Sequence, residues 1–218
     1  MIKAVIFDLD GTLVDSLQDL CDSTNFALQK FGFPTHEVQK YKYFVGDGIP
    51  KLIERVIPKE NFNNEIHKKV LAAFMERYRE HYLDKTAPYN GVKESLAALL
   101  DAKVKLAVVS NKADEMATRV VNKLFSGEFT SVTGKREDYP LKPNPALTLK
   151  VIEDLGVKPC ECAFLGDSGM DMATAKNAGC VAVGVLWGFR TRDELLDNGA
   201  DYIINNPSET ASFILGLE

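Results

Sequence analysis

The sequence predicts an α/β fold, a doubly wound parallel sheet (Rossmann-like core) with a small helical cap domain inserted after the first strand. An apolar, β-branched run at residues 4–7 is typical of a buried strand. Residues 16–85 show helical spacing and no strand pattern, and from residue 91 onward helix and strand patterns alternate. We therefore expect residues 1–15 and 86–218 to form the catalytic core and residues 16–85 to form the cap.

The first strand ends at two acidic residues, Asp8 and Asp10, and Gly11 and Thr12 follow them. In an extended chain, side chains two residues apart point to the same side. Two carboxylates held together in this way are costly unless a cation or a shared proton relieves them. The alternative is an ordinary turn at the end of a strand, in which Asp and Gly are common.

The inserted segment has the patterns of several helices. Residues 16–31 carry apolar side chains at helical spacing, with Ser16 as a candidate N-cap and Gly32 as the residue that ends the helix. A second helix is expected from about residue 35. A glycine-rich turn then enters a third helix, and a long amphipathic helix is expected at about 63–82.

The segment after residue 91 alternates between helices and strands. We expect helices at 92–102, 113–124, 172–177, 193–196 and 207–215, and a further helix that the chain enters through 142–146 and that ends at 155. We expect strands at 104–109, 129–133, 163–165, 181–185 and 202–204. Parallel strands joined by helices form an open sheet, and its ligands bind at the carboxyl ends of the strands. The polar motifs of this sequence fall at such ends.

Composition limits the classes of function. The chain has 218 residues, of which 45% are hydrophobic, enough for one core and a smaller domain. A net charge of -5 and a pI near 5.4 argue against general nucleic-acid binding. The apolar stretches are too short for a membrane span, and the first residues lack the pattern of a signal peptide, so a cytoplasmic address is the default expectation.

Cysteine and histidine offer no separate chemistry. The four cysteines are read as reduced thiols, because Cys160 and Cys162 are too closely spaced for a usual zinc site and no histidine is near them. The three histidines lie in the helical insertion without partner motifs. A Ser-His-Asp hydrolase has no support.

Two further motifs offer groups for a phosphoryl oxygen. Ser110 and Asn111 follow an apolar strand, where a hydroxyl and an amide could bind such oxygens, although a helix cap is the better explanation from the local residues alone. Lys142 precedes Pro143, which fixes the backbone just beyond it. Its ammonium could neutralise a phosphoryl group and a nucleophile together, and the alternative is a solvated lysine.

The last motif contains two acids four residues apart, Asp167 and Asp171, at a strand-to-helix turn. Such oxygen ligands suit a hard cation, and magnesium (Mg2+) is held by one or two carboxylates plus phosphate. Asp8 and Asp167 would be direct ligands together with the backbone carbonyl of Asp10, and Asp171 a ligand or a neighbour of one. A bound cation would also relieve the crowding of the acids.

Together these motifs, in this order, resemble those of the haloacid dehalogenase-like hydrolase superfamily, and the resemblance spans residues 2–204. It implies that Asp8 is a nucleophile, that Asp10 is the acid–base, and that Ser110 and Lys142 complete the catalytic group. Thr12 and Asn111 are then expected to contact the substrate. Ser110 stands where Thr is also usual and keeps the hydroxyl, as does Ser168 in the last motif.

Asp10 separates the branches of that superfamily, because the dehalogenase and phosphonate-cleaving branches lack an acid there. Residues 45–55 and 184–202 resemble the phosphoglycolate phosphatase-like branch. The resemblance implies a magnesium-dependent phosphatase that hydrolyses a small phosphate monoester, 2-phosphoglycolate, through an aspartyl-phosphate. The expected partner is this small molecule, with no nucleic acid and no membrane, and the chain is expected to be a monomer or homodimer.

Several alternatives stay open. A β-phosphoglucomutase-like phosphomutase shares the chemistry, and relatives with the same motifs hydrolyse pyrophosphate or sugar phosphates. Outside enzymes, a receiver-like module also has acids, a hydroxyl and a lysine at strand ends, but its acceptor Asp lies on a middle strand and it has no helical cap. A partner-binding protein without activity would not need every catalytic position filled.

The cap residues Gly46, Gly48 and Arg55 are the candidates for substrate selectivity. The glycines permit positive φ or a close backbone approach at a helix start, where amide groups can meet an anion. Arg55 would add a fixed charge and a forked donor for a substrate carboxylate. The alternative is a surface arginine beside glycines that only shape a turn.

Overall fold

The computed structural model describes residues 1–217, which form two compact units. One unit contains Met1–Val14 and the chain from Pro88 onward, and the other contains Asp15–Ala87. Each unit has its own buried apolar core. Among the described residues, no helix is both long enough and apolar enough to cross a lipid bilayer.

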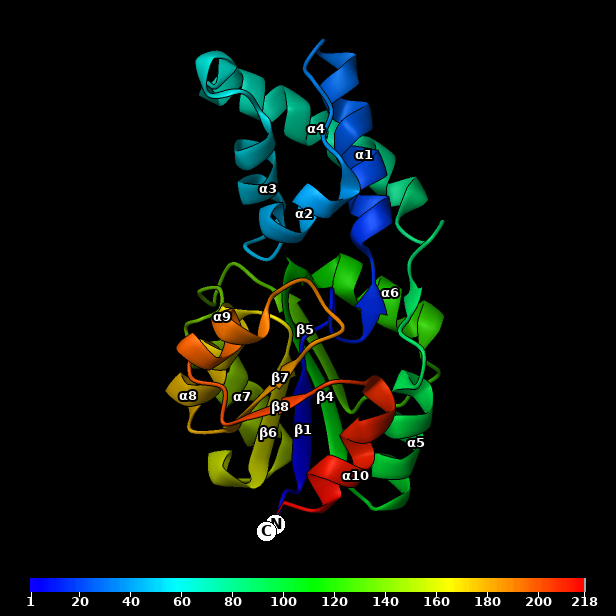
Figure 1. The fold of residues 1–218 in the computed structure, drawn as a ribbon, viewed down its shortest axis with the longest axis vertical. Coiled ribbons are helices and arrows are strands. Elements are labelled where there is room, and N and C mark those ends of the chain that lie inside the picture. The colour runs from blue at the N-terminus through cyan, green and yellow to red at the C-terminus, as the bar shows by residue number, and fades with distance from the viewer. Residues whose placement is uncertain (218) are drawn as a thin grey trace. The chain divides into compact units, whose positions relative to one another are not determined.

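The first unit is built on a six-stranded sheet in the order β5-β4-β1-β6-β7-β8 (Figure 1). Every neighbouring pair is parallel. The strands are β1 Ala4–Phe7, β4 Lys105–Ala113, β5 Ser131–Lys135, β6 Cys162–Gly166, β7 Val181–Val185 and β8 Tyr202–Ile204. The strand order reverses at β1, which confirms the predicted doubly wound α/β fold.

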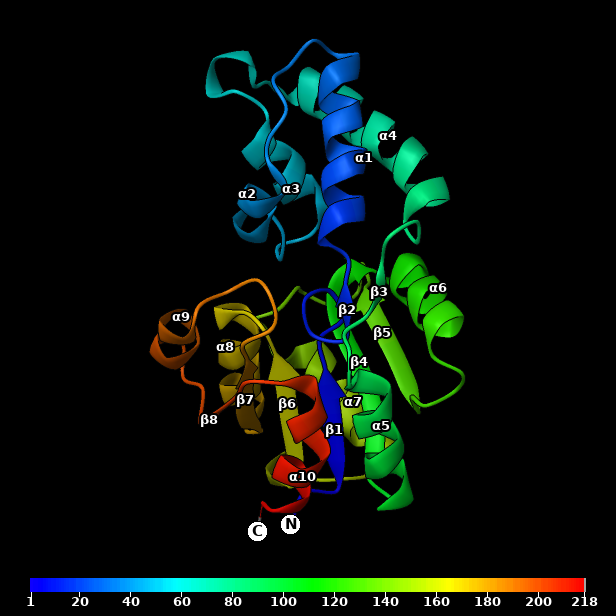
Figure 2. The same cartoon turned by 45° about the vertical axis from the view of Figure 1, so that its right-hand side comes forward.

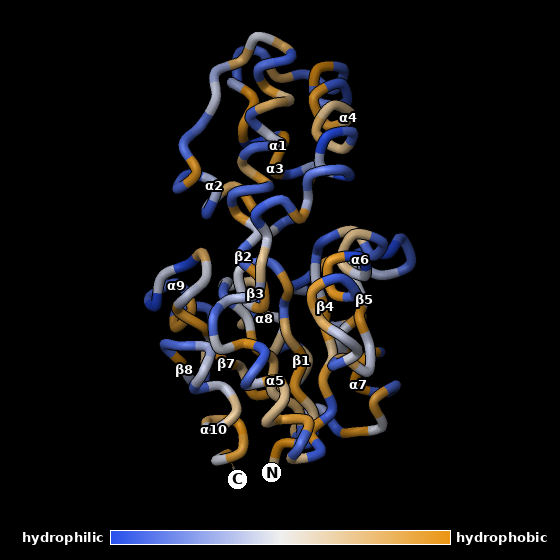
Figure 3. The backbone as a smooth tube through the Cα atoms, turned by 90° about the vertical axis from the view of Figure 1, so that its right-hand side faces the viewer, coloured by the Kyte–Doolittle hydropathy of each residue, from blue (hydrophilic) through white to orange (hydrophobic). Residues whose placement is uncertain are grey.

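Helices cover both faces of this sheet (Figure 2). They are α5 Val92–Asp101, α6 Asp114–Leu124, α7 Ala146–Leu155, α8 Gly169–Ala178, α9 Arg192–Asp197 and α10 Thr210–Leu215. Ile6 packs in a cluster with residues of α7 and α8, whereas its neighbour Phe7 faces residues of α5 on the other side. A strand buried on both faces must be apolar throughout, which explains the continuous run in β1, also visible in Figure 3.

The second unit is helical, with α1 Leu17–Lys30, α2 Val38–Phe44, α3 Ile49–Val56 and α4 Asn64–His81. Tyr41, Phe74 and Tyr78 are among its fully buried side chains. The Asn63 side chain caps α4 by accepting hydrogen bonds from the amides of Glu65 and Ile66 at 3.0 and 2.9 Å. The core of this unit therefore contains large side chains from both α2 and α4.

Two expected features of the helical unit were wrong. Ser16 stands at the N-cap of α1 but its side chain makes no capping hydrogen bond, and Asp15 instead accepts from the amide of Leu17 at 3.3 Å. The second helix begins at Val38 instead of near residue 35. The helix starts later because the Asn25 side chain accepts a hydrogen bond from the His36 amide at 3.0 Å and donates one to the His36 carbonyl at 2.9 Å.

A small two-stranded sheet, which the sequence patterns did not indicate, joins β2 Val14–Asp15 to β3 Ala87–Pro88. These strands contain the two points where the chain passes from one unit to the other. Just before β3, the buried carboxylate of Asp19 accepts bonds from the amides of Lys85 and Thr86 and from the Thr86 hydroxyl, the last at 2.7 Å. The return segment is thus fixed to α1.

Three element bounds in the first unit differ from expectation and affect the site. β4 was expected to end at residue 109 but extends to Ala113, because an irregularity between Val109 and Ala113 restores its pairing with β5. β5 lies two residues later than expected. α8 begins at Gly169 instead of residue 172, because Ser168 caps it.

Candidate active site

The polar motifs of the sequence meet at the carboxyl ends of β1, β4 and β6 in the first unit. Asp8 follows β1 directly, Ser110 lies near the end of β4, and Asp167 follows β6. Asp171 lies in the first turn of α8. Because β1 is the strand at which the sheet order reverses, this edge is where an open α/β sheet leaves room for a ligand.

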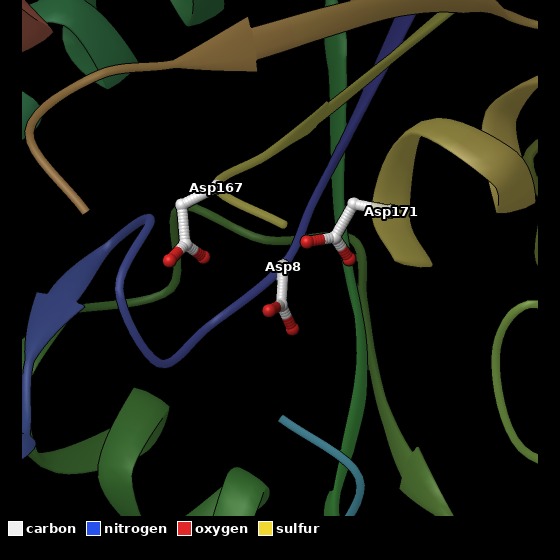
Figure 4. A group of neighbouring side chains, drawn as sticks. All are labelled: Asp8, Asp167 and Asp171. Carbon is white, nitrogen blue, oxygen red and sulfur yellow. The ribbon is translucent and has the colours of Figure 1, made fainter. Parts of the chain in front are cut away.

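Three carboxylates, those of Asp8, Asp167 and Asp171, form one cluster (Figure 4). Each offers an oxygen within 4.8 Å of the others; Asp8 follows β1, and Asp167 and Asp171 belong to the turn from β6 into α8. Burial, with a contribution from the Asp171 charge, raises the pKa of Asp8 to about 6, although Lys142 acts against it. Burial and the charges of Asp171 and Asp8 raise the pKa of Asp167 to about 8.

Lys142 supplies a buried positive charge beside this cluster. Its Nζ lies 2.9 Å from Asp8 Oδ1 and 2.6 Å from Asp171 Oδ1. Burial alone would lower the pKa of Lys142, but the carboxylates of Asp171 and Asp8 raise it well above its ordinary value. One ammonium among three carboxyl groups leaves an excess of acid, and this donor set fits a hard divalent cation.

Asp167 is held by backbone and side-chain donors on both oxygens. The Thr12 hydroxyl donates to Oδ1 at 3.2 Å, and the amide of Phe189 donates to Oδ2 at 2.8 Å. A Cβ atom at Gly11 would lie 2.4 Å from Asp167 Oδ2, and one at Gly188 would lie 2.3 Å from Asp167 Cβ. Only glycine fits at these two positions, so the carboxylate sits in a close-fitting cradle.

Both carboxylate oxygens of Asp171 also have partners. Its Oδ2 accepts from the Ser168 hydroxyl at 2.6 Å and from the Ser168 amide at 3.1 Å, in a capping box at the start of α8. Its Oδ1 contacts Lys142. These contacts orient Asp171 toward the lysine, with Asp8 on the lysine's other side.

Ser110 and Asn111 are both buried at the end of β4. Neither caps α6, whose N-cap is Ala113. The Asn111 amide oxygen accepts from the backbone amide of Lys142 at 3.0 Å, so this side chain fixes the backbone that carries the lysine. The Ser110 hydroxyl oxygen accepts from the amide of Lys112 at 3.3 Å.

Two features of the site were missed in the sequence. Lys112 is buried, and its Nζ lies 3.1 and 3.0 Å from the two carboxylate oxygens of Asp10. The loop after β7 reaches back to the first motif, where the indole of Trp187 donates to the Thr12 carbonyl at 2.9 Å. The available signals were weak: a lysine next to Ser110-Asn111, and a Trp-Gly pair after a strand.

The candidate cap residues lie in the second unit. Gly46 and Gly48 both have positive φ, 119° and 84°, and Gly48 is the N-cap of α3. Arg55 forms an ion pair with Asp47, between the two glycines, and donates to the Phe44 carbonyl at 2.9 Å. The guanidinium therefore braces the turn that precedes α3.

Comparison with known proteins gives similarity along nearly the whole chain. A family described as haloacid dehalogenase-like hydrolase matches residues 5–185. A phosphoglycolate phosphatase from Chromobacterium violaceum is 35% identical over 95% of this chain and 94% of its own, and one from Aquifex aeolicus is 31% identical over the same shares.

Solved structures agree with this pattern. A Lactobacillus delbrueckii protein provisionally assigned as a phosphoglycolate phosphatase has a TM-score of 0.93 and 32% identity, with 99% of each chain covered. A β-phosphoglucomutase from Clostridium difficile has a TM-score of 0.78 and 20% identity, over 96% of this chain and 93% of its own. The second likeness concerns the fold alone.

Proposed function

Because the chain belongs to the haloacid dehalogenase-like hydrolase family, as its sequence motifs predicted, we propose that it is a phosphatase acting on a small phosphate monoester, 2-phosphoglycolate. The main observation behind the proposal is the ion pair between Asp8 and Lys142, whose charged atoms lie 2.9 Å apart. Asp8 lies two residues before the second acid, Asp10. A nucleophile beside a fixed cation, with a second acid close in sequence, suits phosphoryl transfer from an alcohol.

The reaction has two steps. In the first, a carboxylate oxygen of Asp8 bonds to phosphorus, the ester P–O bond breaks, and Asp10 gives its proton to the leaving alcohol oxygen. In the second, Asp10 takes a proton from water, whose oxygen bonds to phosphorus as the bond to Asp8 breaks. Phosphate leaves and both carboxyl groups return to their starting state.

Other residues bind and orient the phosphoryl group. Lys142 balances the charge on the phosphoryl oxygens and on Asp8. Ser110 donates its hydroxyl to a phosphoryl oxygen from the end of β4. Asn111 and Thr12 are proposed to bind the substrate as well, and each also orients a neighbour, Asn111 the Lys142 backbone and Thr12 the Asp167 carboxylate.

We propose Mg2+ as the cation, held by Asp8, Asp167 and the backbone carbonyl of Asp10, with Asp171 beside it. The raised pKa values of Asp8 and Asp167 support this assignment, because they reflect acids crowded together in a buried site and a divalent ion would relieve that crowding. When bound, the ion supplies positive charge to the phosphoryl oxygens.

The substrate proposal rests on the names of the relatives at 31–35% identity. We propose that residues 1–15 and 86–218 carry the chemistry and that residues 16–85 close over the leaving group. Gly46, Gly48 and Arg55 would then meet the carboxylate of 2-phosphoglycolate. The cytoplasmic address and the monomeric or dimeric state stay predictions.

The test is phosphate release from a panel containing 2-phosphoglycolate, β-glucose 1-phosphate, a sugar 6-phosphate, pyrophosphate and p-nitrophenyl phosphate. We expect 2-phosphoglycolate to be preferred with magnesium present and all release to stop in excess chelator. Preference for another ester would replace the substrate, and full activity in chelator would overturn the metal assignment. Glucose phosphate interconversion without phosphate release would favour the phosphomutase.

A further inference from the structure

The ion pair between Lys112 and Asp10 joins residues 102 positions apart in the chain. Both oxygens of the Asp10 carboxylate contact the same ammonium, at 3.1 and 3.0 Å. The Lys112 side chain is 4% exposed and that of Asp10 is 20% exposed. The lysine is therefore the more deeply buried member of the pair, and the acid is the more exposed one.

The backbone of Lys112 is fixed as firmly as its side chain. It lies inside β4, where its amide donates to the Ser110 hydroxyl oxygen at 3.3 Å. Gly134 of the neighbouring strand packs against it so closely that a Cβ there would lie 2.5 Å from the Lys112 carbonyl oxygen. Both ends of this lysine are thus constrained, and movement of Asp10 is limited by a rigid partner.

A buried ammonium is costly to maintain unless a carboxylate accompanies it. Lys142 already supplies the positive charge beside Asp8 and Asp171. Lys112 forms an ion pair with Asp10. Both buried lysines thus pair with acids of this site, Lys142 with Asp8 and Asp171 and Lys112 with Asp10.

We propose that Lys112 is a positioning residue that holds the Asp10 carboxyl group in the orientation from which it gives its proton to the leaving oxygen. This inference rests on the proposed function, in which Asp10 is the acid–base. The support for the role is geometric, because contacts at 3.1 and 3.0 Å to both oxygens fix where the Asp10 carboxyl group lies. Lys112 then acts through Asp10 without contacting the substrate.

The proposal predicts a dependence on the leaving group. Glycolate leaves as a strongly basic alkoxide unless it is protonated, whereas p-nitrophenolate leaves readily without a proton. Loss of a lysine that only binds phosphate or supports the fold would affect both esters alike, since both carry the same phosphoryl group. Loss of a lysine that positions the acid would affect the alkyl ester selectively.

The experiment compares kcat/KM for 2-phosphoglycolate, or for the best alkyl ester of the panel, with kcat/KM for p-nitrophenyl phosphate at saturating Mg2+. We expect Lys112→Met to lower the first about 10- to 100-fold and the second by less than about 3-fold, because displacing the acid costs less than the roughly 100- to 10,000-fold effect of losing general acid–base catalysis. Lys112→Arg should restore much of the loss, because its forked guanidinium can contact both oxygens of Asp10.

Two controls make the result specific. Lys105→Met removes a lysine from the opposite end of the same strand and should leave both substrates unchanged. In an Asp10→Asn background, Lys112→Met should cost nothing further, because the group through which it acts is already altered.

Equal losses on both esters, or losses that add fully to those of Asp10→Asn, would overturn the role of Lys112 while the phosphatase proposal stands. A wild-type protein that releases phosphate from no ester would overturn the phosphatase proposal itself, and the positioning role with it.

Discussion

The ammonium of Lys142 lies 2.6 Å from the carboxylate of Asp171, and the two side chains are 5% and 0% exposed. Lys142 also contacts Asp8 at 2.9 Å, so a single buried cation joins the loop before α7 to β1 and to α8. Asn111 accepts a hydrogen bond from the backbone amide of Lys142, and the Ser168 hydroxyl donates one to Asp171. The carboxyl edge of the sheet is therefore tied together by charge as well as by packing.

The first prediction concerns that cation. Lys142→Met leaves the carboxyl groups of Asp8 and Asp171 without their ammonium, and we expect it to lower the free energy of unfolding by about 3–5 kcal/mol in chelator. Added Mg2+ should restore part of the loss. Lys150→Met is the matched control, because its ion pairs with Glu153 and Asp154 are exposed and should be worth at most about 1 kcal/mol. Urea unfolding measures both, and similar losses would contradict the prediction.

The second prediction concerns pH and metal. Burial raises the pKa of Asp8 to about 6 and that of Asp167 to about 8 in the folded protein, from an ordinary value of 3.8 in the unfolded chain. Raised carboxyl pKa values stabilise the fold at low pH, and this contribution is lost as pH rises through them. In chelator, the free energy of unfolding should therefore fall between pH 5 and 8.

Magnesium should stabilise the protein more at pH 8 than at pH 5, because its ligands must first lose their protons. Asp167→Asn should remove most of the slope and most of the metal effect. Thermal unfolding with and without Mg2+ measures both quantities. A chelated wild-type protein whose stability rises from pH 5 to 8 would show that the acids are not crowded in this way.

Local patterns were enough to predict the sheet and the acids of the site. β1 is buried on both faces, so its apolar run is visible in the sequence, and Asp8 follows it directly. Asp167 is marked in the same way by β6 and by the capped start of α8. Each of these signals lies within a few residues of the group it identifies.

Contacts between distant segments could not be predicted in the same way. The pair of Lys112 with Asp10 depends on the irregular end of β4, which sequence periodicity placed at residue 109. The close approach of Gly188 to Asp167 depends on a loop two strands away in the sheet order from β1. At Ser16 a local signal was misleading. The residue was predicted to cap α1, but the neighbouring Asp15 accepts the hydrogen bond from the Leu17 amide instead.

The third prediction uses that close approach. A methyl group at Gly188 would overlap Asp167 Cβ and the Gly11 carbonyl oxygen, at 2.3 and 2.4 Å. Gly188→Ala should therefore shift the carboxylate and raise the Mg2+ concentration needed for half-maximal activity about 10- to 100-fold. Gly216→Ala, where the nearest heavy atom is 3.3 Å away, is the control. Unchanged metal dependence in Gly188→Ala would show that the cradle does not set the ligand position.

The fourth prediction separates function from stability at Asp8. Asp8→Asn should abolish turnover, because an amide cannot form the phosphoryl intermediate. It should leave the melting temperature in chelator equal to or above that of the wild type, since one of three crowded acids is gone. Intact-mass analysis after rapid acid quenching should find a phosphorylated wild-type chain and none in the variant. Near-normal kcat in Asp8→Asn would exclude the covalent mechanism.

The last prediction concerns selectivity in the helical unit, where Arg55 is shared between Asp47 and the Phe44 carbonyl. If this guanidinium binds a substrate carboxylate, that carboxylate must compete with Asp47. Arg55→Ala should then lower kcat/KM for 2-phosphoglycolate about 10- to 100-fold, as expected for a charged hydrogen bond, with little effect on p-nitrophenyl phosphate. Gly48→Val should act in the same direction, because its φ of 84° disfavours a β-branched residue.

Asp47→Asn gives the opposite sign and therefore the sharper test. It keeps the size of the side chain but removes the anion that competes for Arg55, so KM for 2-phosphoglycolate should fall while that for p-nitrophenyl phosphate stays constant. An arginine that only braces the turn would respond differently, because loss of Asp47 would then loosen the turn and affect both substrates alike. Parallel changes on the two esters in Arg55→Ala and Asp47→Asn would assign this ion pair to the stability of the turn and leave the chemistry at Asp8 untouched.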